Sequence, residues 1–219
     1  VLVLLTALIG SSAFILQSNN GIAGYTGSPG EITCSGNGSC HGGGSSATSG
    51  ITITAVPAFS VNINSDLEYM PDTTYQITVQ ASAAGFTRYG FGCEVLNASN
   101  TNAGNLQNAG TGVKFLNSAG KRNAVHTTPK TGNAIASFTF KWVAPSGGDA
   151  TFYAIANAVN GNNNTSGDFV ISPVSMNLVA APVPPPDTNT VGIKENTFVP
   201  VTGVSVYPNP ASSLTNISY

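Results

Sequence analysis

Hydrophobic and polar residues alternate with a period of two through most of the chain. Alternation of this kind predicts half-buried β-strands. It occurs in residues 51–56, 74–82, 88–97, 112–117, 124–128, 133–145, 150–159 and 169–179. Turn-forming residues, such as Pro71 and Asp72 and the runs SGGD and GNNNTSGD, separate these segments. No segment has the 3.6-residue period of an amphipathic helix. The pattern predicts an all-β fold, an antiparallel, immunoglobulin-like β-sandwich of about eight strands.

The longest alternating segment, residues 133–145, also predicts which side chains face the core. One face carries small and polar side chains, and the other carries Ala136, Phe138, Phe140 and Trp142. Because apolar faces of two sheets pack against each other, we expect the aromatic face to lie between them. The aromatic residues expected in this core are Phe91, Phe138, Phe140, Trp142, Phe152 and Tyr153.

The composition of the chain argues against two classes of function, nucleic-acid binding and general acid–base catalysis. Only 7% of the residues are charged, and the net charge is −2, so no basic patch exists that would bind nucleic acid. The nine carboxylates form no close pair except Asp66 and Glu68, which lie beside a turn. General acid–base catalysis needs carboxylates held in contrasting environments, and the chain has no Gly-x-Ser-x-Gly motif either. The sequence therefore predicts a protein that is not an enzyme.

The two ends of the chain differ from its middle. Residues 1–23 contain an apolar run followed by Gly21, Ile22 and Ala23, which indicates a truncated secretory signal peptide; an uncleaved membrane anchor is the alternative. Residues 24–50 form a Gly/Ser-rich segment, residues 51–180 the sandwich, and residues 181–200 a proline-rich linker. Residues 201–219 are expected to begin a second, small β-domain that is cut short. Export permits either disulfides or periplasmic haem attachment.

The Gly/Ser-rich segment holds the residues with the most distinctive chemistry. Cys34, Cys40 and His41 fall within eight residues. A His directly after the second of two cysteines is typical of c-type haem attachment, in which two thioethers hold the porphyrin and the His binds iron. Here five residues separate the cysteines instead of the usual two. His126, the only other histidine, is the candidate for the opposite axial ligand, with Met70 and Met176 in reserve.

Two other uses of these residues are open. Cys34 and Cys40 can form a disulfide with each other, or one of them can pair with Cys93. Cys93 alternates with Phe91 and Val95 on one strand face, which predicts a buried thiol. Two thiolates and the two imidazoles also match the ligand set of structural zinc, although His126 is distant in sequence.

The C-terminal segment VYPNPASS resembles the start of the sorting domain carried by substrates of the Bacteroidetes type IX secretion system. The matching residues are Val206, Tyr207, Pro208, Asn209, Pro210 and Ala211. The resemblance implies the type IX secretion machinery as a partner, and a protein that is secreted or displayed outside the outer membrane.

The body of the chain resembles bacterial members of the reelin-N-terminal-like (reeler) β-sandwich family, also called choice-of-anchor proteins. The matching segments are YTGSPGEITC with CHGG, MPDTTYQITVQ, RYGFGCEVL, AVHTT, FTFKWVAPSGG and ATFYAIANAVN. Bacterial members often carry a Cys-x-x-Cys-His motif here, and this chain departs by three inserted residues; animal members hold a Cys and a His without haem.

The resemblance implies a secreted cell-surface module for adhesion or another extracellular interaction, with an unknown surface or matrix partner. Loops such as 97–112 and 160–167 would make the contacts, since loops on rigid scaffolds carry function. The alternative is an extracellular monohaem c-type electron-transfer protein. Its haem c would be held by Cys34 and Cys40, and its iron would be bound by His41 and His126.

Overall fold

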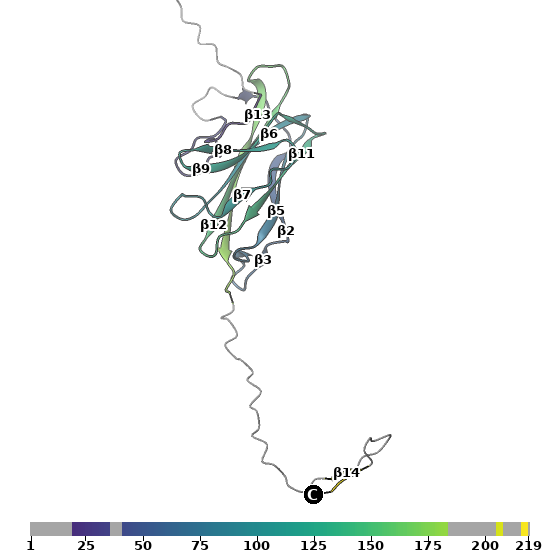
Figure 1. Cartoon of the computed structure of the whole chain (residues 1–219). Coiled ribbons are helices and arrows are strands. Elements are labelled where there is room, and N and C mark those ends of the chain that lie inside the picture. The colour runs from purple at the N-terminus through teal and green to yellow at the C-terminus, as the bar shows by residue number, and fades with distance from the viewer. Residues whose placement is uncertain (1–18, 36–40, 184–204, 208–215, 219) are drawn as a thin grey trace, which may run out of the picture. The chain divides into compact units, whose positions relative to one another are not determined.

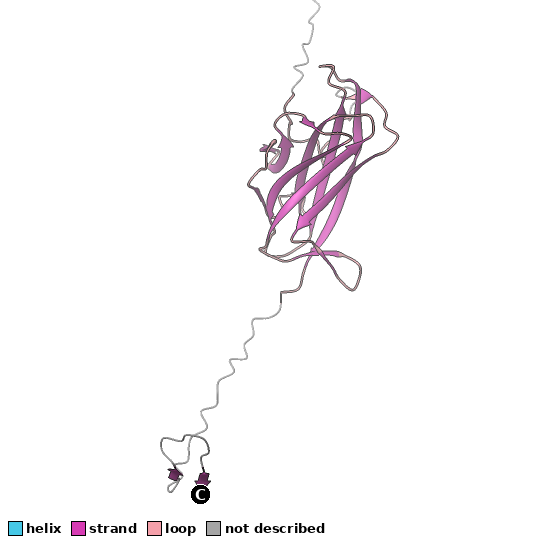
Figure 2. Cartoon of the chain, turned by 90° about the vertical axis from the view of Figure 1, so that its right-hand side faces the viewer, coloured by secondary structure: helices cyan, strands magenta, loops and turns pink. Residues whose placement is uncertain are grey.

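A computed structural model describes residues 19–35, 41–183, 205–207 and 216–218, the last two ranges as backbone strands. Within these residues the protein is all-β and contains no helix (Figure 2). The described part of the chain accordingly offers no helical segment with the length and hydropathy of a membrane span. The chain divides into two units at residue 183.

The larger sheet of the first unit has the strand order β3-β4-β13-β12-β6-β9-β8, with β1 paired to β13 and β10 paired to β6 (Figure 1). Its strands are β1 (Gly42–Gly43), β3 (Ser60–Val61), β4 (Leu67–Tyr69), β6 (Arg88–Leu96), β8 (Val113–Ser118), β9 (Lys121–His126), β10 (Lys130–Thr131), β12 (Ala150–Val159) and β13 (Ser166–Ala180). Two short pairs, β1 with β13 and β4 with β13, are parallel, and the other strand pairs of both sheets are antiparallel, as predicted. β13 has 15 residues and would otherwise be an edge strand, and these short segments pair with its open side.

The smaller sheet has the order β2-β5-β11-β7 and faces the larger one, which confirms the predicted β-sandwich. Its strands are β2 (Ser49–Val56), β5 (Thr74–Ala83), β7 (Asn105–Gln107) and β11 (Ile135–Val143). All eight predicted strands are present. The strands that the sequence missed have two or three residues each, too few to show a period: they are β1, β3, β4, β7 and β10. In the second unit, β14 (Ser205–Tyr207) pairs with β15 (Asn216–Ser218).

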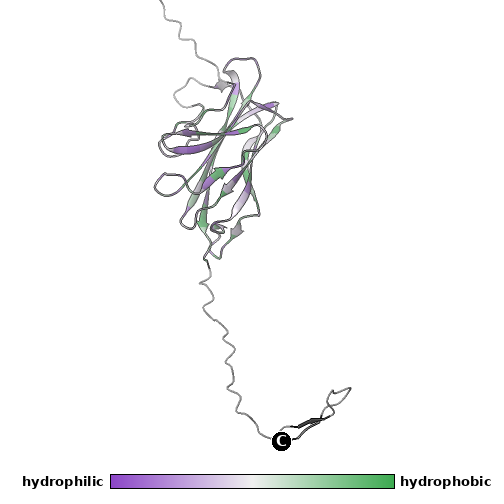
Figure 3. Ribbon diagram, viewed as in Figure 1, coloured by the Kyte–Doolittle hydropathy of each residue, from purple (hydrophilic) through white to green (hydrophobic). Residues whose placement is uncertain are grey.

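The core lies between the two sheets, and apolar and polar residues are interspersed along the strands (Figure 3). The apolar face of β11 is buried as predicted, with Phe138 stacked on Phe91 at 4.1 Å between ring centroids. Trp142 packs edge-on against Phe152 at 5.0 Å. Tyr153 was wrongly predicted to join this core. It follows the inward-facing Phe152 directly, and successive side chains of a strand point to opposite faces, so Tyr153 points outward and is only half-buried.

The central strand β6 is buried on both faces, which an ordinary sandwich strand is not. Phe91, Cys93 and Val95 point inward, as predicted. Gly90, Gly92 and Glu94 alternate with them and therefore point away from the core. The N-terminal segment, residues 19–35, covers this outer face. The candidate site forms between that segment and β6.

Candidate functional site

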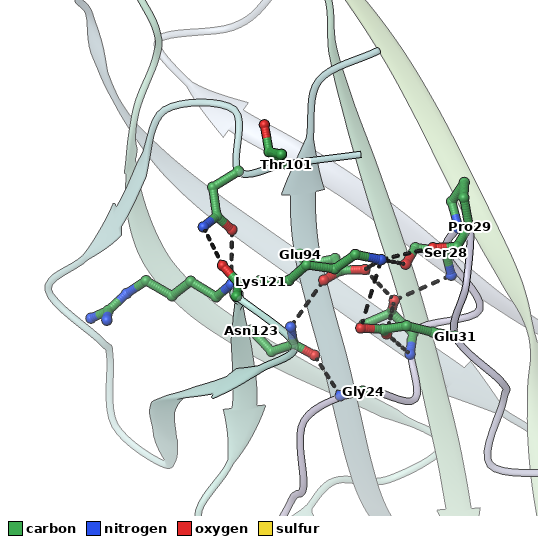
Figure 4. Close-up of polar contacts among 12 residues, drawn as sticks. Gly24, Ser28, Pro29, Glu31, Glu94, Thr101, Lys121 and Asn123 are labelled. Carbon is green, nitrogen blue, oxygen red and sulfur yellow. Dashed lines mark hydrogen bonds and ion pairs between the residues drawn. The ribbon is translucent and has the colours of Figure 1, made fainter. Parts of the chain in front are cut away.

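A buried polar cluster holds the N-terminal segment on the outer face of the larger sheet (Figure 4). Its centre is Glu94 of β6, which is fully buried. The hydroxyl oxygen of Thr26 lies 2.8 Å from both Glu94 Oε1 and Glu31 Oε2. Asn123 Nδ2 donates to Glu94 Oε2 at 3.0 Å, and Asn123 Oδ1 accepts the Gly24 N–H at 3.0 Å. Each polar atom named here has a partner, as burial requires.

Lys121 supplies the positive charge of this cluster. Its Nζ lies 3.9 Å from Glu94 Oε1 and 4.0 Å from Glu31 Oε1. The same ammonium donates to Ser28 Oγ at 3.1 Å and to the Pro29 carbonyl at 2.8 Å. These contacts hold residues 26–31 against β9. They fix the position from which the chain continues to Cys34.

A cavity of about 560 Å³ lies beside this cluster, within the range of small-molecule sites. Its apolar lining includes Gly90, Gly92, Ile155 and Ala156 from β6 and β12. Three of the residues singled out in the sequence also line it, and they come from distant parts of the chain: Cys34, His41 and His126.

His126 occupies a gap in the β6–β9 ladder. The regular pairing ends at Gly92 and Val125, and the imidazole Nδ1 lies 3.1 Å from the Phe91 nitrogen and 3.2 Å from the Phe91 oxygen. Glycines make room for the ring on two sides. A Cβ at Gly90 would lie 2.6 Å from His126 Cε1, and one at Gly21 would lie 2.8 Å from His126 Nδ1. Glycine within a strand often marks such a close approach.

The environment of His126 favours the neutral ring. Burial lowers the pKa of His126, the positive charges of Lys114 and His41 act in the same direction, and the Phe91 carbonyl opposes them. In one tautomer of the neutral ring Nδ1 accepts the Phe91 N–H at 3.1 Å and Nε2 carries the proton; in the other, Nδ1–H donates to the Phe91 carbonyl at 3.2 Å and Nε2 keeps a lone pair. His41 and His126 both line the cavity.

His41 is positioned by the larger sheet. The following residues form β1 on the edge of β13, and the Gly44 N–H donates to the Asp168 carbonyl at 3.0 Å. His41 Nδ1 donates to Asp168 Oδ2 at 2.7 Å. The Asp168 side chain is only 3% exposed, and its Oδ1 accepts the Asn160 N–H at 3.0 Å. This arrangement places the proton on Nδ1 and leaves Nε2 as the nitrogen for a ligand.

The remaining candidate residues that the structure describes do not line this cavity. Cys40 lies outside the described residues. Cys93 is a free, fully buried thiol on the inner face, where burial raises its pKa, so a disulfide from Cys34 or Cys40 to Cys93 is not formed. The reserve ligands were predicted wrongly. Met176 pairs with Phe152 and packs on the core, and Met70 is half-exposed, so neither lines the cavity.

The structure contains no preformed zinc site among the residues it describes. No three His, Cys, Asp or Glu side chains within that part of the chain are grouped to hold a metal ion directly. Of the sorting motif, Tyr207 belongs to β14, whereas Pro208, Asn209 and Pro210 lie outside the described residues.

Sequence reasoning missed Asp168, which holds His41, and two other polar residues of the cavity lining. Asp168, Asn157 and Arg88 also line the cavity, yet each is a single polar residue in a strand with no motif around it. One signal was available. The run RYGFG places glycines at alternate positions of a predicted strand, and such glycines indicate that another group approaches that face.

Comparison with known proteins gives fold-level similarity only. No family model matches the chain, and no curated protein matches it. The reelin-N domain of F-spondin is 17% identical, with a TM-score of 0.39, over 64% of this chain and 89% of that one. A human F-spondin reeler domain is 16% identical, with a TM-score of 0.38, over 68% and 96% of the two chains.

A cohesin module from a Clostridium perfringens family 33 glycoside hydrolase is 12% identical, with a TM-score of 0.38, over 61% of this chain and 98% of that one. Identities this low do not transfer a function to the chain. The function is argued from the residues of the site itself.

Proposed function

We propose that this protein is a β-sandwich module that carries one covalently attached haem c in the cavity beside β6 and acts in electron transfer. The single observation that supports this most is the position of His126. It lies 85 residues after His41 in the sequence, yet both imidazoles and Cys34 line one cavity. Both rings use Nδ1 for contacts within the protein, and His126 would offer Nε2 to iron in the tautomer that donates Nδ1–H to the Phe91 carbonyl.

The residues present fit such a group. Cys34 and Cys40 would hold it through thioethers, and His41 and His126 would bind its iron. When bound, the haem iron supplies one-electron redox chemistry. Asp168 keeps the Nδ1 proton of His41 in place and makes that imidazole a stronger electron donor. Gly90, Gly92 and Ile155 would lie against the apolar part of such a group.

The test is production of the full chain in a host that exports proteins and attaches c-type haem. We expect the added mass of one haem, a Soret band, and the low-spin spectrum of two imidazole ligands. C34S should lose covalent attachment. H126A should keep the haem but become high-spin. C93S is the matched control, because Cys93 faces the core, and it should leave both the haem content and the spectrum unchanged.

A different result would overturn the proposal. If the protein contains no haem and peptide mapping shows a disulfide between Cys34 and Cys40, the electron-transfer function is wrong. The non-enzymatic surface module expected from the sequence would then be the better description. Its adhesion role, its extracellular location and its export by the type IX machinery stay predictions that the sequence alone supports.

A further inference from the structure

One end of the cavity contains polar side chains whose hydrogen-bonding capacity is not used within the protein. Asn157 of β12 is only 6% exposed, and its Oδ1 has no hydrogen-bond partner. A buried carboxamide oxygen left unpaired is costly, so such groups usually serve a ligand or water. Asn157 lines the cavity directly and is paired across the sheet with Gly90, over which the His126 ring lies.

Arg88 lies at the same end. It starts β6 opposite Val159, two residues from the Gly90–Asn157 pair, so Arg88, Gly90 and Asn157 share the outer face of the sheet. Its guanidinium lies over Gly161, where a Cβ would be 3.4 Å from one terminal nitrogen. Within the described residues, the Arg88 guanidinium has neither an ion pair nor a hydrogen bond.

The positive charge of Arg88 at this end of the cavity is therefore not balanced by a carboxylate of the lining. The only carboxylate in the lining is Asp168, and both of its oxygens already accept hydrogen bonds, from His41 and from the Asn160 N–H. The opposite part of the lining is apolar, with Gly92 and Ile155. A ligand that fits this lining has a flat apolar body and an anionic end.

We propose that Arg88 and Asn157 form the carboxylate-binding end of the cavity and receive the propionate groups of the haem. This inference rests on the proposed function and adds the orientation of the cofactor. Arg is suited to the role because its planar guanidinium donates two parallel hydrogen bonds to one carboxylate. The Asn157 amide can turn so that its NH₂ group donates to the same anion.

The test uses the full chain, produced without the attachment machinery and kept reduced, with two probes: Fe(III)-protoporphyrin IX and its dimethyl ester. The ester has the same body but no carboxylates. We expect the wild type to bind the diacid about five-fold more tightly, the effect of one partly exposed ion pair. R88Q should remove this preference. R122Q is the matched control, because Arg122 lies on β9 over Phe115 and does not line the cavity.

A second variant gives an independent test in case R88Q alters the local structure as well as the charge. N157D is nearly isosteric and adds a carboxylate at the same point, so it should weaken binding of the diacid and not of the diester. If the wild type binds neither probe, the proposed function itself is wrong. If it binds both equally, or if R88Q and R122Q behave alike, the haem function stands and the assignment of Arg88 and Asn157 is overturned.

Discussion

At the scale of single residues, the site depends on positions where a side chain is absent. The His126 ring fits only because Gly21 and Gly90 leave space on either side of it. In sequence these glycines are two of 25 and carry no motif. Their importance comes from contacts with a residue on another strand.

Substitution of Gly90 tests this packing. In G90A the new methyl group would meet the His126 ring at 2.6 Å, so the ring must leave its place between Phe91 and Gly21. We expect the free energy of unfolding to fall by about 1–3 kcal/mol, the usual cost of overpacking, and the His126 pKa to rise towards its ordinary value as the ring becomes more exposed. Chemical denaturation and NMR titration of the imidazole measure these effects.

The control is G92A on the same strand and face. A Cβ there would make only ordinary contacts, 3.7 Å to Ile155 and 3.8 Å to Thr26. Its stability should be unchanged or higher by about 0.4–1 kcal/mol, because alanine reduces the freedom of the unfolded chain. Equal losses in the free energy of unfolding in G90A and G92A would show that the His126 ring does not depend on the space at Gly90.

At the scale of elements, the N-terminal segment is part of the sandwich rather than a loose leader to it. It closes the outer face of β6 and carries Cys34 to the cavity. The segment is attached through polar contacts. The Thr26 hydroxyl lies between the carboxylates of Glu31 and Glu94, and both carboxylates lie near the Lys121 ammonium. The position of Cys34 therefore depends on a salt-bridge cluster more than on hydrophobic contact.

Removal of the ammonium tests the attachment. K121M leaves two buried carboxylates without their cation, so we expect a loss of roughly 3 kcal/mol in the free energy of unfolding. Hydrogen exchange should become faster in residues 24–33, because the bonds to Ser28 and Pro29 are lost as well. K141M, a half-buried lysine of β11 on the opposite sheet, should change neither quantity by a comparable amount. Unchanged exchange in K121M would mean that other contacts hold the segment.

At the scale of the whole molecule, the surface carries few charges. The seven Lys and Arg residues include Lys121, which is nearly buried, and Arg88, which lines the cavity. A polyanion is bound by several basic side chains that together displace its counterions, and this chain has no such group of residues.

We therefore expect the full chain to pass through heparin and DNA columns without retention at 50 mM salt. Retention that persists at 150 mM salt would contradict the prediction that nucleic acid is not a partner of this protein. Addition of three lysines to the exposed loop 97–101 is the positive control, since it creates the basic patch that the natural surface lacks.

The sequence by itself determined the class of fold and the core. Alternation with a period of two depends only on neighbouring residues, so all eight longer strands and the buried face of β11 could be predicted from it. Local spacing also made Cys34 and His41 candidates for one site. The short strands were missed because two or three residues show no period. Tyr153 was misplaced because it was assigned to the core as an aromatic residue, although the alternation with Phe152 beside it puts the two on opposite faces.

Only the tertiary structure decided what surrounds those candidates. The place of His126 in the same cavity lining as His41 depends on a gap in the β6–β9 ladder, and the Asp168–His41 bond joins residues 127 apart. Contacts of this kind arise when sheets pair and the N-terminal segment packs on them. No local sequence pattern predicts these contacts, because strand order and register are set by the whole set of strand pairings rather than by any one segment.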